Sequence, residues 1–351
     1  TEKMPGYYRT KIGTDAFPLW HNDLNLEAQG TQLPLWLEGK KEYPVKAIFG
    51  LGMNYRMLPE SDRLARAMSE HLDFFVNGDL FLTDTCRYAD IVLPICSSFE
   101  RSNFYGGSGH VYYAKPVIAP LGQSKSDMEV ITEMANRLEL DDPLLKAGYE
   151  ACLDEILKPT GLTIEEVAAA NYPVPVKNTE EFVPLAFSKS GFLTPTGKFE
   201  LKSTVIEAYR GEHKLDAIPT WSTPLDDQDE ERYPFVLTSG NRLPNALHSR
   251  LHEVPYLRSM HKEPTAYLNP EDAAGMGIEG GERVELYNDY GAIRLKAQPD
   301  AHLQPGNINV FHGYREADCN VMIPIAACDP YSGFPNFGTT RCNIRVLKGE
   351  K

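Results

Sequence analysis

The first third of the chain consists largely of short apolar runs separated by polar turns. The run V-K-A-I-F-G-L at 45–51 predicts a buried strand, and the runs at 74–76 and 91–93 predict two more. Between the first two, P-E-S-D at 59–62 opens a helix that ends near residue 71, because proline and acidic residues suit a first helical turn. Strand, helix and strand in this order predict half of a doubly wound α/β domain with parallel strands, over residues 45–140.

Two further signals lie before residue 140. Ser126 and Glu129 stand at capping-box spacing, so a helix is expected directly after Ser126. Its apolar stripe, which predicts a face turned to a core, consists of Met128, Ile131, Met134, Ala135 and Leu138. The glycine-rich stretch 106–109 lacks the lysine of a phosphate-binding loop, which favours a flexible surface loop.

The flanking segments carry weaker patterns. Residues 1–44 are interpreted as a lead-in with one helix around 22–32. Residues 141–230 are interpreted as a bridge with helices near 148–157 and 162–169. Two short β-like runs joined by the turn T-P-T-G-K are expected within 191–203.

The pattern changes to short alternating strands near residue 231. The acidic stretch at 225–231 predicts a solvated boundary. Runs at 283–287 and 292–297 alternate and predict a hairpin, and Asn269 is expected to cap a short helix. Further strands are expected at YPFVLTSG and NINVFHG. Together these predict a small β-barrel over residues 231–351.

Length and charge narrow the class of protein. A chain of 351 residues suits two or three domains, and 42% of its residues are hydrophobic. No run approaches the roughly 20 apolar residues of a membrane helix, so a soluble protein without direct membrane insertion is expected. The net charge of −14 disfavours a nucleic-acid partner, and an anionic cofactor would need local donors.

The six cysteines show no paired spacing. Neither a zinc ribbon nor an iron–sulfur motif is visible, and buried free thiols are the preferred interpretation. They do not indicate a compartment, so the localisation is unknown, with the cytoplasm or the periplasm of a prokaryote both open.

Two groups of residues are candidates for ligand binding before any resemblance is considered. Gly52 and Asn54 follow the first strand in G-L-G-M-N, where a close backbone approach to phosphate and a tight turn are both open. Asp79 and Thr83 follow the second strand, at the ligand edge of an α/β sheet. The alternative is that Asp79 caps a turn.

Several motifs follow one order along the chain from about residue 44: GLGMN, DLFLTDTCRYADIVLP, TPTGKFEL, SGNRLPNALHSR, NPEDAAGMGIEGGERVEL, HGY and DPYSGFPNFG. This order resembles the molybdopterin-dependent oxidoreductases of the dimethyl sulfoxide reductase family. The resemblance implies a double-psi β-barrel at the C-terminal end. It also implies a bis-molybdopterin guanine dinucleotide cofactor with molybdenum or tungsten.

The resemblance also implies the cofactor contacts, which are Gly52, Asn54, Asp79, Thr83, Asn241, Arg242, His248, Ser249, His312, Asn320, Ser332, Asn336 and Phe337. Asp79 and Thr83 would hold a guanine, while Asn241, Arg242, His248 and Ser249 would approach a pterin or its pyrophosphate. Taken alone, Arg242 would be a surface ion pair, His248 a core histidine and His312 part of a turn. Gly338 stands where the family often has lysine.

In the family, the protein ligand of the metal and the iron–sulfur cysteines lie in earlier sequence. The chain is therefore expected to be the C-terminal portion of a larger catalytic subunit and inactive alone. The missing N-terminal part, an iron–sulfur electron-transfer subunit and a small-molecule substrate are the implied partners. The implied reaction is a two-electron redox step or oxygen-atom or hydroxyl transfer. The alternatives are a non-catalytic binding or assembly module and a nicotinamide dehydrogenase, which Tyr55 at the third glycine position disfavours.

Overall fold

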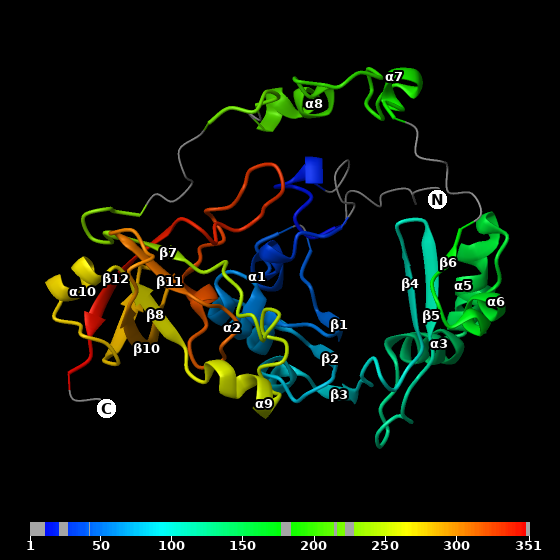
Figure 1. Cartoon of the computed structure of the whole chain (residues 1–351), viewed down its shortest axis with the longest axis horizontal. Coiled ribbons are helices and arrows are strands. Elements are labelled where there is room, and N and C mark those ends of the chain that lie inside the picture. Colours follow the sequence, from blue (N-terminus) through cyan, green and yellow to red (C-terminus); the bar gives the residue numbers. More distant parts are fainter. Residues whose placement is uncertain are drawn as a thin grey trace. The chain divides into compact units, whose positions relative to one another are not determined.

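The computed structural model describes residues 11–20, 27–41, 43–176, 184–213, 216–221 and 228–348 (Figure 1). The chain divides into two compact units. The first unit comprises Thr1–Ala47, Asn54–Phe74 and Leu193–Lys351, and the second comprises Ile48–Met53 and Phe75–Phe192. Each unit is considered by itself below.

The predicted α/β strands form one three-stranded sheet in the order β1-β2-β3. Its strands are β1 (Ala47–Leu51), β2 (Phe74–Asp79) and β3 (Ile91–Pro94). β2 and β3 are parallel. β1 advances in the same direction as β2, because Asp73 donates to the Lys46 carbonyl and Gly52 to the Gly78 carbonyl. These strands are confirmed. The predicted burial of the first and third runs is wrong, since Phe49 is 42% exposed in β1 and Ile91 is 46% exposed on an edge strand.

Two helices begin and end close to the predicted positions. α2 (Ser61–His71) buries Leu64, Ala67 and Met68. α3 (Asp127–Arg137) carries the predicted capping box, in which Ser126 Oγ accepts from the Glu129 amide and Glu129 accepts from the Ser126 amide. Of its apolar stripe only Ala135 is buried and Leu138 is 63% exposed, so the predicted burial of that face is wrong. The capping box is local chemistry, whereas burial depends on a covering partner.

A second small sheet belongs to the second unit. β4 (Asn103–Gly107), β5 (His110–Ala114) and β6 (Val174–Pro175) are antiparallel in the order β4-β5-β6. The glycine-rich stretch is therefore part of a hairpin rather than a flexible loop, and Ser108 and Gly109 turn it with positive φ. The predicted helices are α5 (Tyr149–Leu157) and α6 (Ile164–Ala170), which lie beside this sheet in Figure 1. They share a core with it, made of Val111, Tyr113, Leu153, Leu157, Leu162, Ile164 and Val167.

The remaining short elements lie in the connecting segments. They are η2 (Gly30–Gln32), α1 (Leu33–Leu37), η3 (Tyr55–Met57), η4 (Asp84–Tyr88), α4 (Pro143–Ala147), η5 (Lys158–Thr160), α7 (Phe187–Ser190), α8 (Thr204–His213), α9 (Pro255–Arg258) and η6 (Ser259–His261). The two β-like runs predicted within 191–203 are wrong, because no strand forms there. Parts of the predicted helix at 22–32 and of the acidic stretch at 225–231 lie outside the described residues.

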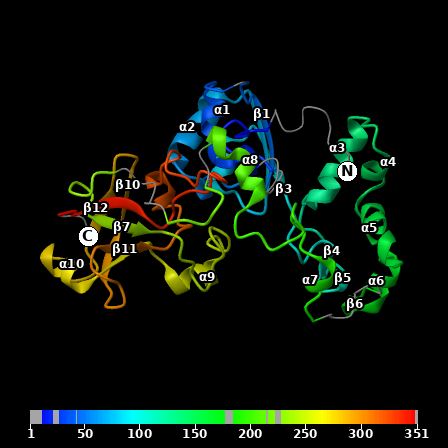
Figure 2. The same ribbon diagram turned by 90° about the horizontal axis from the view of Figure 1, so that it is seen from above.

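Six strands of the first unit close into a barrel in the order β10-β8-β11-β7-β12-β9 (Figure 2). They are β7 (Phe235–Thr238), β8 (Thr265–Leu268), β9 (Arg283–Tyr287), β10 (Ala292–Pro299), β11 (Asn307–Val310) and β12 (Thr340–Val346). β8 is parallel to β10 and β7 to β11, and the other pairs are antiparallel. The predicted barrel is confirmed, although β8 and β12 were not expected from the sequence.

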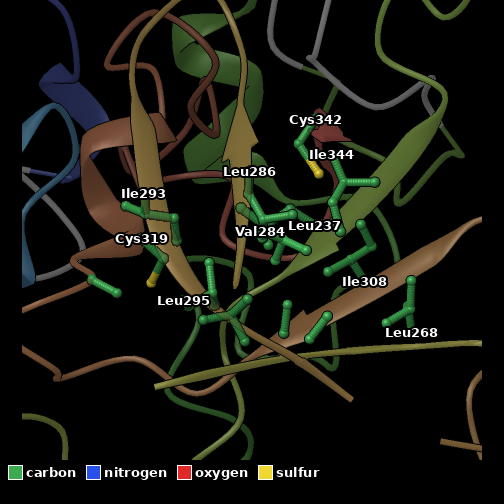
Figure 3. Packing of buried hydrophobic residues seen from close by; sticks show 14 of the residues in the cluster. Leu237, Leu268, Val284, Leu286, Ile293, Leu295, Ile308, Cys319, Cys342 and Ile344 are labelled. Atoms are coloured by element: carbon green, nitrogen blue, oxygen red, sulfur yellow. The ribbon is translucent and has the colours of Figure 1, made fainter. Parts of the chain in front are cut away.

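The barrel interior is the main hydrophobic core of the first unit. Figure 3 shows Leu237, Val284, Leu286, Leu295 and Ile308 gathered between the strands. Each is completely buried, because alternate residues of a strand face inward in a closed barrel. α10 (Pro270–Gly275) follows β8, and its predicted cap is confirmed by the Glu271 amide donating to Asn269 Oδ1 at 2.7 Å. This core fixes the barrel strands whose ends carry the site.

Candidate functional site

Polar side chains gather at the carboxyl ends of β7 and β11. These strands are parallel neighbours with Thr238 opposite Asn309, so both end at one mouth of the barrel. Asn241 Nδ2 donates to Asn309 Oδ1 at 2.7 Å, and the Thr238 hydroxyl lies 3.3 Å from the same oxygen. Barrel mouths are common ligand sites. Asn309 was missed by the sequence analysis, although its polar side chain in the apolar run N-I-N-V was a visible signal.

Two histidines extend this cluster. His248 Nδ1 lies 2.8 Å from His312 Nε2, and His312 Nδ1 lies 2.8 Å from the carbonyl oxygen of Ser239. His312 is buried and His248 is half-buried. Burial lowers the pKa of His248, and the nearby His312 and Arg242 act in the same direction. The structure thus places His248, Ser249 and His312 near this mouth, and the cofactor contacts that the resemblance implied for them stay predictions.

The segment D-P-Y-S-G-F-P-N-F-G reaches the same mouth through Phe337. The Phe337 carbonyl accepts from both the amide and the hydroxyl of Ser239, each at 3.1 Å. Ser332 has a different place, because its hydroxyl donates to Asp329 Oδ1 at 2.8 Å and accepts from the Phe334 amide. Ser332 therefore shapes its own loop, with Asp329 as a partner that the sequence analysis missed.

The side-chain amide of Asn336 indicates whether this region suits a ligand that is rich in oxygen atoms. Its Oδ1 accepts from the hydroxyl of Thr339, which orients the amide group. Its Nδ2 is buried and has no hydrogen-bond partner in the described part of the chain. A buried donor without a partner costs about 1–3 kcal/mol. A phosphate or pterin oxygen would satisfy it, so the residues present fit a molybdopterin dinucleotide.

The turn after β1 also contacts the barrel loops within the first unit. Asn54 Nδ2 donates to Ser249 Oγ, and Asn54 Oδ1 accepts from the Arg56 amide at 3.2 Å. Asn320 lies in η7 (Cys319–Met322), and its side-chain Nδ2 donates to the Arg56 carbonyl. Asn54 and Asn320 thus hold this turn to the barrel, whatever further contacts they make.

A buried aspartate beside Asn320 also escaped the sequence analysis. Asp318 Oδ2 accepts from the Ser61 hydroxyl at 2.7 Å and lies 3.3 Å from Arg56 Nη1. Burial raises the pKa of Asp318 to about 6, against the opposing effects of Ser61 and Arg56. No sequence pattern pointed to it, because its burial arises from packing between residues 56–61 and η7.

In the second unit, Asp79 is the last residue of β2. Its Oδ1 accepts from the Leu80 amide at 2.7 Å and its Oδ2 from the Thr83 hydroxyl at 2.9 Å. This is the geometry of a turn cap, yet each oxygen keeps a lone pair for a ligand. Gly52 has φ +67° in the turn after β1, with open space around its α-carbon. The guanine contact of Asp79 and Thr83 stays a prediction.

The predicted site residues fall into two sets. Gly52, Asp79 and Thr83 belong to the second unit and the other ten to the first. Arg242 is exposed and makes no ion pair with any residue that the structure describes. Among those residues there is also no group of three or more histidine, cysteine or acidic side chains arranged to hold a metal ion. None of the described helices combines the length and apolar character needed to cross a membrane.

Two family models match the chain. The Molybdopterin oxidoreductase model matches residues 22–137, and the Molydopterin dinucleotide binding domain model matches residues 235–341. The first match includes the α/β sheet, and the second covers most of the barrel with its mouth. The candidate site of the first unit therefore lies mainly within a dinucleotide-binding region.

Curated relatives and a solved structure agree with these models. Acetylene hydratase of Syntrophotalea acetylenica is 29% identical over 84% of this chain and 40% of its own length. Dimethyl sulfoxide/trimethylamine N-oxide reductase of Rhodobacter capsulatus is 29% identical over 78% of this chain and 36% of its own. The structure of acetylene hydratase from Pelobacter acetylenicus matches with a TM-score of 0.84 and 24% identity, over 97% of this chain and 52% of that one.

The relatives therefore agree on the fold, and the chain spans less than half the length of the two curated relatives it matches. The predicted combination of an α/β part with a β-barrel is confirmed at this level. The family models, the relatives and the fold lead to one conclusion: this chain belongs to the molybdopterin-dependent oxidoreductases of the dimethyl sulfoxide reductase family.

Proposed function

We propose that this chain is the C-terminal cofactor-binding portion of an oxidoreductase catalytic subunit that uses bis-molybdopterin guanine dinucleotide with molybdenum or tungsten. The observation that carries the proposal is the polar cluster at the barrel mouth, with the unpartnered Asn336 donor, inside the region that matches a dinucleotide-binding model. The fraction of the relatives' length that the chain covers supports its assignment as one portion of a larger subunit.

When bound, this cofactor supplies two-electron chemistry at its metal, and the protein binds and orients it. In this chain Asn241, His248 and Ser249 would bind at the barrel mouth, together with the Asn336 donor. Asp79 would accept from a guanine, while the Thr83 hydroxyl, whose hydrogen is donated to Asp79, would contact the guanine as an acceptor. The names of the relatives include both a hydratase and an oxide reductase, so they do not select one reaction. We propose a two-electron redox step or oxygen-atom or hydroxyl transfer.

Two details of architecture belong to the same proposal. We propose that the barrel has double-psi topology, which its two parallel strand pairs support. We also propose that β1, β2 and β3 are half of a doubly wound sheet completed by an N-terminal part of the same subunit. The exposed edge strand β3 supports this. An iron–sulfur cluster in that part and an iron–sulfur electron-transfer partner would complete the enzyme.

The proposal can be tested on this chain by calorimetric titration with guanosine diphosphate and adenosine diphosphate. Guanosine diphosphate should bind at least about tenfold more tightly, because adenine presents a lone pair where guanine presents N1–H. Asp79→Asn should remove that preference. At the barrel mouth, Asn336→Ala should separately weaken the binding of inorganic pyrophosphate about fivefold, as the loss of one hydrogen bond implies.

Asp90→Asn is the matched control. Asp90 is also an aspartate beside this sheet, and its carboxylate accepts from the Phe75 amide at 2.7 Å rather than facing the predicted ligand edge. This variant should keep the guanine preference. Equal affinities for the two nucleotides in the unmodified chain, or no binding of either, would refute the proposed function.

A further inference from the structure

The first unit has a cavity on the outer face of its barrel, formed by residues other than those of the mouth. Its volume is about 880 Å³, which is in the range of small-molecule sites. Arg294 lines it from β10, where the neighbouring Ile293 and Leu295 are buried in the barrel core. Since successive residues of a strand face opposite sides, Arg294 faces outward. None of the thirteen predicted cofactor contacts lines this cavity.

Charged side chains dominate the lining of the cavity. Five cationic side chains stand against three glutamates, which leaves a surplus of two positive charges in a protein whose net charge is −14. A cavity with such a surplus concentrates anions near it. The cations are Arg258, Lys262, Arg283, Arg294 and Arg315, and the glutamates are Glu253, Glu263 and Glu316.

Arg258 builds the wall of the cavity. Its Nε donates to the Lys262 carbonyl at 2.9 Å, and its Nη2 donates to Glu316 Oε1 at 3.0 Å. Its Nη1 donates to His252 Nδ1 at 3.0 Å, and burial and Arg258 lower the pKa of His252, so the neutral ring accepts. The guanidinium also lies 4.6 Å from the centre of the Tyr314 ring. Arg258 thus has all three nitrogens engaged and fixes the backbone that carries Lys262.

Two further charges of the lining are balanced by partners outside it. Arg294 Nε donates to Glu285 Oε2 at 3.0 Å, and the Glu285 carboxylate is buried. Glu263 forms an ion pair with Lys296. Neither Arg294 nor Glu263 therefore needs a ligand to balance its charge.

Lys262 and Arg283 are the cations that a ligand can use. Neither makes an ion pair with any residue that the structure describes. Both act on the same carboxyl, because the pKa of Glu263 is lowered first by its hydrogen bond to Lys296 and further by Arg283 and Lys262. A guanidinium supplies a planar fork of donors and an ammonium supplies a compact charge, and phosphate accepts from both. The cavity thus offers two uncompensated positive charges near one place.

Glu253 adds a different requirement. It is exposed and lines the cavity, and it makes no hydrogen bond or ion pair with the described residues. An ionised carboxylate can only accept, so it repels a second anionic group and suits a hydroxyl donor. A matching ligand therefore combines one compact anionic group with separate hydroxyl groups.

We propose that this cavity binds a small organic phosphate monoester whose organic part carries hydroxyl groups. Lys262 and Arg283 contact the phosphate, and Glu253 accepts from a hydroxyl. A phosphate monoester carries about −1.5 to −2 charges at pH 7 on one compact group, which matches the surplus of the cavity. A dicarboxylate spreads its charges along a chain, and a phosphate diester has a single charge. This site is independent of the molybdopterin cofactor and goes beyond the proposed function.

Calorimetric titration of this chain with ribose 5-phosphate at pH 7.5 and low ionic strength tests the site. The Kd should be about 1 mM or lower. Arg283→Ala and Lys262→Ala should each weaken binding at least about tenfold, because each removes a charged hydrogen bond to the phosphate. Circular dichroism checks that both variants fold.

Arg66→Ala is the matched control for these two variants. Arg66 is an exposed arginine of α2 that makes no ion pair with any described residue and does not line the cavity, so its removal changes the net charge by the same amount. It should leave the Kd for ribose 5-phosphate within about twofold. No binding up to about 10 mM ligand, or equal losses in Arg66→Ala and Arg283→Ala, would overturn the proposal.

Inorganic phosphate and succinate test the nature of the ligand. Ribose 5-phosphate should bind about fivefold more tightly than inorganic phosphate, and Glu253→Ala should remove this advantage, because the hydroxyl of the sugar loses its acceptor. Succinate should bind more weakly than either phosphate. Tighter binding of succinate, or an unchanged advantage of ribose 5-phosphate in Glu253→Ala, would overturn the ligand assignment.

The same titrations separate this site from the cofactor site. Asn336→Ala and Asp79→Asn should leave the Kd for ribose 5-phosphate unchanged, and Lys262→Ala should keep the preference for guanosine diphosphate. Loss of ribose 5-phosphate binding in Asn336→Ala would place the phosphate at the barrel mouth and overturn the proposal. Binding of ribose 5-phosphate without any guanine preference would instead count against the proposed function alone.

Discussion

Gly313 determines how closely two loops approach each other at the residue scale. Its φ of +101° lies in the region that favours glycine. A β-carbon there would overlap the His248 carbonyl and lie 3.1 Å from His252 Nε2. Neither neighbour has an easy way to move, because one is backbone and the other is a ring in contact with Arg258 and Tyr314.

Gly313→Ala should therefore destabilise the protein by about 2 kcal/mol or more, since the left-handed conformation and the overlap add. Urea denaturation followed by circular dichroism measures the change. Gly338→Ala is the matched control, because its α-carbon has ordinary φ and open space around it. It should change the free energy of unfolding by less than about 1 kcal/mol. Equal effects of the two substitutions would contradict this account of Gly313.

Asp318 links stability to pH. Burial raises the pKa of its carboxyl to about 6 in the folded protein, from 3.8 when it is exposed. Near pH 2, well below both pKa values, the carboxyl is protonated in both states, so burial of a charge costs nothing. As pH rises toward 6 and above, the unfolded chain ionises first, and ionisation favours unfolding.

The free energy of unfolding of the unmodified protein, relative to Asp318→Asn, should accordingly fall by about 3 kcal/mol between pH 2 and pH 7. Asparagine keeps the size of the side chain and does not titrate, so the difference between the two proteins isolates this carboxyl. Denaturation curves at several pH values give the result. A difference that stays constant, or grows with pH, would show that the ion pair with Arg56 outweighs burial.

At the element scale, α3 begins where its own sequence dictates. Ser126 and Glu129 exchange both bonds of a capping box, at 3.2 and 2.7 Å. Ser126→Ala should lower the stability of the protein by about 1 kcal/mol, because an amide of the first turn loses its partner. Ser98→Ala is a suitable control, because Ser98 is exposed and lies outside the helix. Thermal unfolding followed by circular dichroism compares them, and an undisturbed melting temperature in Ser126→Ala would show that the cap is dispensable.

Whether an element is determined by its own sequence or by distant partners explains which helices and strands could be predicted from the sequence. α3 and α6 carry capping boxes, α2 and α5 carry apolar residues at helical spacing, and the hairpin β9–β10 has its own turn. All were expected from the sequence. β8 and β12 were missed, because β12 is completed by pairing with β7 and β9, which are distant in sequence. The β-like runs within 191–203 find no such partner strand. Elements set by their local sequence could therefore be predicted, whereas strands that depend on pairing with distant segments could not.

The candidate site follows the same logic. His248, His312 and Asn241 meet at one barrel mouth, whereas Ser332 serves its own loop, and the cofactor contacts of all four stay predictions. Asp318 could not be found from its type alone, since its role depends on burial produced by packing. Asn309 did leave a signal, as a polar residue within an apolar run.

At the scale of the whole molecule, the two units differ in how many separate segments of the chain they contain. Apart from the short piece Ile48–Met53, the second unit is one continuous stretch, Phe75–Phe192. The first unit collects three stretches, and the loop at residues 329–333 contacts residues near the other end of the chain. Gln29 donates to the Ser332 carbonyl, and Phe17 packs against Gly333.

This arrangement has a consequence for synthesis on the ribosome. The second unit has nearly all of its residues once about position 192 has emerged, whereas the barrel waits for β12, which ends at Val346. Until that moment β7 lacks one of its two neighbours and its backbone groups stay exposed. Nascent chains halted before residue 340 should thus protect the second unit from protease and leave β7 open to chaperones, so that the last strand to be translated decides when the cofactor site can form.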